Sequence, residues 1–169
     1  MPGRRFSEGW TPEFVEHVAE TLDIGPGTEV FEVACGSGEF LIPLHENGFI
    51  VGGLEADPAL VAAALAAMPD GRFMAGPPAE LDPGQPWQVV ICRSFADFPD
   101  ADHARGVLAR MAAKATHAVA ILDVPEGRFE RRWLVRALAE IGASAVQVEE
   151  VSETEVEPTE ARYNVFARL

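Results

Sequence analysis

The stretch "TEVFEVACGSGEFL", residues 28–41, decides the fold because a strand-like run passes directly into a turn of small residues. Apolar side chains dominate residues 30–33 and are typical of a strand that is buried on both faces. Residues 34–38 are all small, and two of them are glycines, which tolerate positive φ. Apolar residues at helical spacing then lead to Gly48, where we expect a helix to end. Strand, glycine turn and helix in this order are typical of the opening unit of a nucleotide-binding domain.

The same alternation repeats along the chain and predicts one α/β domain. The final two apolar segments, 143–151 and 161–169, have no helix between them, so we expect them to pair antiparallel at one edge. We therefore predict a single doubly wound three-layer sandwich with a mostly parallel seven-stranded sheet, made of an N-terminal helical segment (1–27) and a core (28–169). The other strands are expected at 28–33, 49–55, 71–76, 87–95 and 117–124, and helices after Thr11, the glycine turn and Asp57, near 102–113 and at 129–141.

Charge and cysteine content narrow the class of protein. Thirteen Lys and Arg face twenty-seven Asp and Glu, and the resulting formal charge of -14 would repel a nucleic-acid backbone. The cysteines, Cys35 and Cys92, form no CxxC motif, and the histidines have no metal-ligand spacing, so we expect a reducing cytoplasm and no metal. No apolar run is long enough to span a membrane, which predicts a soluble, unexported protein.

The glycine turn does not fit the two commonest nucleotide motifs. A dinucleotide fingerprint, GxGxxG, needs a third glycine for close helix packing, and Leu41 occupies that position here. A P-loop requires Gly-Lys-Ser or Gly-Lys-Thr after the turn, and neither follows. A dinucleotide-binding oxidoreductase therefore remains only as a weaker alternative.

The segment "EVACGSG", residues 32–38, resembles the first motif of the class I S-adenosylmethionine-dependent methyltransferases, which reads acidic residue, any, Gly, any, Gly, any, Gly. Glu32 matches the acidic position, Gly36 and Gly38 match the later glycines, and Ala34 replaces the first glycine. Alanine is tolerated there if its φ is negative. The resemblance implies that this turn, including Cys35, lies under the methionine and ribose portions of the cofactor.

Further residues extend the resemblance to the ends of the next strands. Glu55, seventeen residues after Gly38, occurs where this family places the carboxylate that accepts the ribose hydroxyls, although a solvated strand end would read the same way. Ala56 would flank the adenine edge. Pro77 follows a glycine where an aspartate is common, so it could pack on adenine but not accept its hydrogen bond. Arg93, after the fourth strand, completes the predicted cofactor-binding set.

The chemistry implied is methyl transfer to a small-molecule oxygen, nitrogen or carbon nucleophile. This reaction is an in-line displacement, so positioning can supply most of the catalysis and a dedicated base is optional. Asp97 and His103 are weak candidates for a proton acceptor, and a structural role is favoured over a catalytic one for each of them. The competing hypothesis is a catalytically silent methyltransferase-like module that binds the cofactor or a partner protein.

Few segments of this sequence could bind and select the methyl acceptor. The connection after the fifth strand is only "PEGR", which is too short for a lid. Selection would then rest on the N-terminal stretch around Phe6, Trp10 and Phe14, or on a second subunit, so a homodimer is an open alternative. The same aromatic residues have the spacing of an ordinary core-facing helix.

Overall fold

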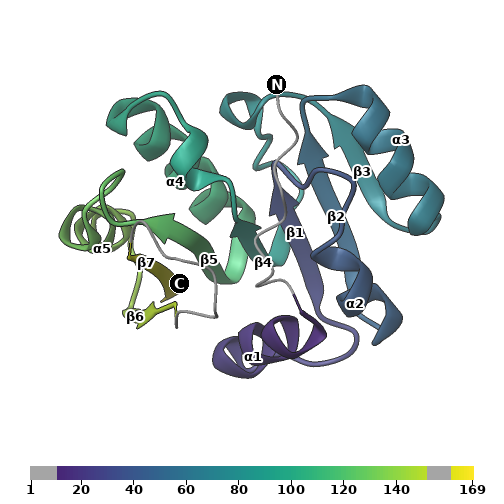
Figure 1. Cartoon of the computed structure of the whole chain (residues 1–169), viewed down its shortest axis with the longest axis horizontal. Coiled ribbons are helices and arrows are strands. Elements are labelled where there is room, and N and C mark those ends of the chain that lie inside the picture. Colours follow the sequence, from purple (N-terminus) through teal and green to yellow (C-terminus); the bar gives the residue numbers. More distant parts are fainter. Residues whose placement is uncertain (1–10, 152–160) are drawn as a thin grey trace.

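A computed structural model of the chain describes residues 11–151 and 161–169, which form a seven-stranded sheet between two layers of helices (Figure 1). The sheet order is β3-β2-β1-β4-β5-β7-β6, and β7 is antiparallel to both of its neighbours while the remaining pairs are parallel. The predicted fold class, including the antiparallel C-terminal pair, is confirmed. The strands are β1 Glu29–Val33, β2 Ile50–Glu55, β3 Arg72–Ala75, β4 Trp87–Cys92, β5 Ala115–Pro125, β6 Ala145–Glu150 and β7 Arg162–Arg168.

The helices begin where the sequence provides caps. Thr11 Oγ1 accepts the Phe14 N–H at the start of α1, and Asp57 Oδ1 accepts the Ala59 N–H at the start of α3. Both caps are followed by a proline, which suits the first helical position. The α-helices are α1 Pro12–Leu22, α2 Leu41–Glu46, α3 Pro58–Ala67, α4 Ala101–Lys114 and α5 Arg131–Glu140, with short 3₁₀ helices η1 Pro78–Glu80 and η2 Phe95–Asp97.

Buried side chains on the two faces of the sheet form two separate cores. Phe31 of β1 packs at 5.2 Å between ring centroids on Trp87, in the core that α4 and α5 cover. The neighbouring residue Val30 belongs to the opposite core, which contains the buried residues of α1 and α2. This alternation explains why residues 30–33 are all buried. In the ranges that the structure describes, no helix is long and apolar enough to cross a membrane.

The strand order places a topological switch point between β1 and β4. The chain moves outward from β1 through β2 to β3, and then returns to add β4 on the other side of β1. In open α/β sheets, ligands bind outside the carboxyl ends of the strands at such a point. The turn that follows β1 lies at this position.

Candidate functional site

The turn after β1 adopts left-handed backbone conformations at three of its residues. Ala34 and Gly36 both have φ of 58°, and Gly38 has φ of 85°. The condition under which alanine would be tolerated at this position, a negative φ, is therefore not met, because the chain enters the left-handed region immediately after the strand. A Cβ in that region costs on the order of 1–2 kcal/mol, so Ala34 is strained where the family motif has glycine.

The two glycines of the turn serve different purposes. A Cβ at Gly38 would lie 2.5 Å from Met68 Cε, so this glycine permits close packing of the turn against the end of α3. At Gly36 the nearest described atom to such a Cβ is Glu39 Oε2, at 3.5 Å. The surface beside Gly36 is therefore the part of the turn that leaves room for a ligand.

Glu55 is fixed directly against this turn by backbone hydrogen bonds. Its Oε2 accepts the Gly36 N–H at 2.9 Å, and its Oε1 accepts the Asp57 N–H at 3.0 Å. The side chain belongs to the last residue of β2 and is half-buried. Each carboxylate oxygen retains a further lone pair, so the pair of oxygens can still accept two hydroxyl groups. The sequence prediction that Glu55 and the turn lie together agrees with this geometry.

Glu32 and Arg93 form a buried ion pair beneath the turn. The Arg93 Nε donates to Glu32 Oε1, while Glu32 is fully buried and Arg93 is only 12% exposed. Burial raises the pKa of Glu32 to about 7, against the opposing charge of Arg93. Within the described residues, Glu32 Oε2 is the buried side-chain oxygen that has no hydrogen-bond partner. A buried carboxylate oxygen in this state is suited to a donor or cation that comes from outside the chain.

Sequence reasoning missed Glu39, which adds a third carboxylate to this group. Ser37 Oγ donates a hydrogen bond to Glu39 Oε1, and the charges of Glu39 and Glu55 both act on Glu32. The signal was available, since an acidic residue directly follows the glycine turn. Three carboxylates and one guanidinium give the site a net negative character that favours a cationic ligand.

The remaining predicted cofactor contacts are less direct. Cys35 is fully buried with its Sγ against Gly53, and its N–H donates to Leu54 O at 3.1 Å, so its side chain supports the turn from below. Burial raises the pKa of the Cys35 thiol, which removes it as a nucleophile. Ala56 and Pro77 are exposed at the same edge of the sheet, where the Gly76 N–H donates to Glu55 O at 3.0 Å.

The two weak catalytic candidates have different surroundings. Asp97 is exposed at the end of η2, just beyond the carboxyl end of β4. The ring of His103, in the first turn of α4, packs on Phe98 with 5.3 Å between centroids. The backbone N–H of His103 donates to Oδ1 of the capping residue Asp100. His103 is therefore half-buried against protein, whereas Asp97 is accessible at the edge where a ligand would bind.

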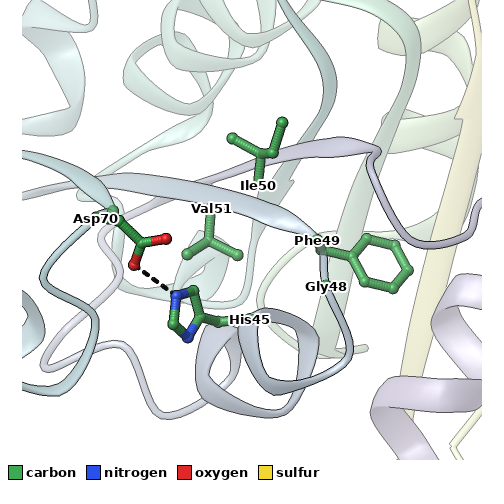
Figure 2. A pocket seen from close by; sticks show the side chains of 7 residues that line it. His45, Gly48, Phe49, Ile50, Val51 and Asp70 are labelled. Atoms are coloured by element: carbon green, nitrogen blue, oxygen red, sulfur yellow. Dashed lines mark hydrogen bonds and ion pairs between the residues drawn. The ribbon is translucent and has the colours of Figure 1, made fainter.

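Figure 2 shows the side chains that line a hollow at the amino end of β2, at the opposite end of the strands from the candidate site. It is formed around Phe49 and Ile50 at the amino end of β2, with His45 Nε2 and Asp70 Oδ1 joined at 2.7 Å. Glu55 lies at the carboxyl end of the same strand. The hollow is thus separate from the candidate site.

Comparison with solved structures places this geometry in a known fold. Magnesium protoporphyrin IX methyltransferase from Synechocystis PCC 6803, solved with bound S-adenosylmethionine, is 21% identical with a TM-score of 0.76, over 94% of this chain and 79% of that chain. CalS10, an amino pentose methyltransferase from Micromonospora echinaspora solved with the same cofactor, is 19% identical with a TM-score of 0.73, over 96% and 93%. An S-adenosylmethionine-dependent methyltransferase from Clostridium acetobutylicum ATCC 824 is 9% identical with a TM-score of 0.75, over 98% and 93%.

No protein-family model and no curated protein matches the chain. The structural similarity nevertheless extends over nearly the whole chain in each comparison. The protein has the α/β fold of the class I S-adenosylmethionine-dependent methyltransferases.

Proposed function

We propose that the chain transfers a methyl group from S-adenosylmethionine to a small-molecule nucleophile. The observation that carries this proposal is the position of Glu55, whose carboxylate is held by the Gly36 N–H beside the "EVACGSG" turn at the switch point of a methyltransferase fold. A carboxylate there can accept both ribose hydroxyls of a nucleoside.

The residues present fit this cofactor. The turn leaves space beside Gly36, and the unpartnered Oε2 of Glu32 lies beneath the turn in a negatively charged surrounding. Gly36 and Glu55 would hold the nucleoside portion, and Glu32 would favour the positively charged portion. Bound S-adenosylmethionine supplies an electrophilic methyl group on a sulfonium, and its net positive charge suits the carboxylates of the site.

The chain itself contributes mainly binding and orientation. Arg93 fixes the direction of the Glu32 carboxylate, and the two backbone N–H groups fix that of Glu55. Because the carboxylates are already oriented, they can hold the cofactor in the geometry that methyl transfer needs. Asp97, exposed at the same edge, is the better placed of the two candidates to take a proton from an O–H or N–H nucleophile.

The acceptor is proposed only as a class. The structural neighbours include a methyltransferase for magnesium protoporphyrin IX and one for an amino pentose, which are chemically different small molecules. The -14 charge of this chain disfavours nucleic acid as an acceptor and favours an uncharged or cationic small molecule.

A direct test is to incubate the protein with methyl-labelled S-adenosylmethionine and the low-molecular-weight fraction of a cell extract. We expect S-adenosylhomocysteine and a labelled small molecule in equal amounts, and neither above background with Glu55→Ala. Cofactor binding without product would instead support the silent module. No binding of S-adenosylmethionine, together with a fluorescence change on mixing with NAD(P)H, would support the oxidoreductase alternative.

A further inference from the structure

Asp123 has a strained backbone inside a central strand, at the edge of the sheet that carries the candidate site. Three described residues other than glycine have positive φ: Asp23, Ala34 and Asp123. Asp23 caps the end of α1, where a left-handed residue is ordinary, and Ala34 belongs to the turn beside the proposed cofactor site. Asp123, with φ of 59°, has neither explanation. Unusual backbone of this kind tends to occur where a side chain is needed in a particular place.

A β-bulge produces this conformation. Between β5 and β7 the pairing runs from Ile121↔Val165 to Val124↔Tyr163, so β5 contains one more residue than β7 over this interval. Two residues, Leu122 and Asp123, thus lie opposite Asn164. Such a bulge interrupts the alternation of side chains and redirects one of them, and bulges are frequent next to active sites.

The neighbouring residues hold Asp123 firmly in place. The side chain of Asn164, which is buried, accepts the Asp123 N–H at 2.9 Å and replaces the interrupted ladder bond. Arg162 Nη1 donates a hydrogen bond to Asp123 O at 3.2 Å and forms an ion pair with Asp123 Oδ2 at 2.8 Å. Among the described residues, the other carboxylate oxygen, Oδ1, has no hydrogen-bond partner, and the side chain is 20% exposed. Asp123 therefore carries a fixed, partly exposed carboxylate, and one of its oxygens has no hydrogen bond to a described residue.

The sheet register places this carboxylate on the side of the switch point opposite to Glu55. The last pair of β4 with β5 is Cys92↔Ile121, so Arg93 and Asp123 both follow that pair on strands that are about 5 Å apart. Glu55 ends β2 and lies on the far side of β1. If the cofactor lies over β1 and β2, the nucleophile must approach the methyl group from the side that the cofactor does not occupy. The carboxyl ends of β4 and β5 border that side.

The geometry points to Asp123 as a residue that binds the methyl acceptor, through a hydrogen bond from an O–H or N–H group of an uncharged or cationic molecule to Oδ1. This inference rests on the proposed function. An anionic acceptor is disfavoured because nearby arginines are engaged by the protein. Arg128 donates to the carbonyls of Ala96 and Pro99, and Arg131 pairs with Glu126 and Glu150.

Two substitutions separate this role from a structural one. Asp123→Gly removes the carboxylate and also the strain at positive φ, so it should keep or raise the unfolding temperature, by about 2–4 °C. Asp23→Gly is the matched control, since it relieves the same kind of strain at the end of α1, away from the site. Asp123→Asn retains the shape of the side chain, and asparagine tolerates a left-handed backbone. When the amide oxygen of this asparagine faces Arg162, its NH₂ group takes the place of Oδ1, so a donor replaces the acceptor.

The assay measures S-adenosylhomocysteine from a low-molecular-weight cell extract divided by ion exchange at pH 7 into anionic, cationic and uncharged fractions. We expect product from the cationic or uncharged fraction, and a loss of about tenfold or more in kcat/KM with Asp123→Gly and Asp123→Asn. S-adenosylmethionine affinity should stay unchanged in both, and Asp23→Gly should match wild type throughout.

Wild-type activity in Asp123→Gly, or product only from the anionic fraction, would overturn the assignment of Asp123 and leave the proposed function intact. Wild-type protein that binds S-adenosylmethionine but gives no product with any fraction would overturn both the assignment and the proposed transfer. If the wild type does not bind S-adenosylmethionine, the proposed function fails at its first step, and the acceptor role of Asp123 fails with it.

Discussion

Replacing Glu32 by Gln should change how stability depends on pH. Burial raises the pKa of Glu32 from its ordinary 4.5 to about 7, against the charge of Arg93. Between these values the folded protein retains a proton that the unfolded chain has lost, so the free energy of unfolding falls as pH rises. The contribution of Glu32 is fully present below pH 4.5 and is lost as pH passes through about 7. Between pH 5 and pH 8 the loss amounts to about 2–3 kcal/mol, since each pKa unit corresponds to about 1.4 kcal/mol.

Urea unfolding of wild type and Glu32→Gln at pH 5, 6, 7 and 8 provides the measurement. The variant lacks a titrating group at this position, so its stability should fall by about 2–3 kcal/mol less than that of wild type over the same range. Glu29→Gln, in the same strand but with a partly exposed side chain, should retain the wild-type profile. Parallel pH profiles for wild type and Glu32→Gln would refute the view that Glu32 is held partly protonated by burial.

The backbone of the turn gives two further predictions. Ala34→Gly should stabilise the protein by about 1 kcal/mol, because glycine relieves the strain at φ of 58°, and thermal unfolding should show a higher midpoint. A lower midpoint would contradict the assigned conformation. Gly38→Ala should destabilise the protein by more than Gly36→Ala, because only the Cβ at residue 38 would collide with Met68, and urea unfolding of the two variants checks the order.

Local sequence signals predicted the elements and part of the site. The caps at Thr11 and Asp57 fixed two helix starts, and the glycine turn after an apolar strand indicated the first unit of the sheet. The proximity of Glu55 to Gly36 also followed from sequence, because adjacent parallel strands end at the same edge.

The features that sequence did not predict depend on contacts between distant residues. The positive φ of Ala34 is unusual for its residue type. Gly38 packs closely against Met68, which lies thirty positions later and meets it only in the folded chain. The bulge at Asp123 arises because β5 contains one more residue than β7 between two paired positions, which no periodicity of either strand reveals. Arg93 was predicted to contact the cofactor, but its pairing with Glu32 was not predicted. Glu32 lies in β1 and Arg93 directly follows β4, and β2 and β3 separate these two strands in sequence.

Calorimetric titration with S-adenosylmethionine tests the central claim most directly. We predict saturable one-to-one binding by the wild type, an affinity at least about tenfold weaker in Glu55→Ala, and an unchanged affinity in Glu29→Ala at the opposite end of the neighbouring strand. Thermal unfolding of Glu55→Ala confirms that the turn and sheet remain folded. Absence of binding by the wild type, or equal affinity in wild type and Glu55→Ala, would contradict the claim that the cofactor binds at this turn.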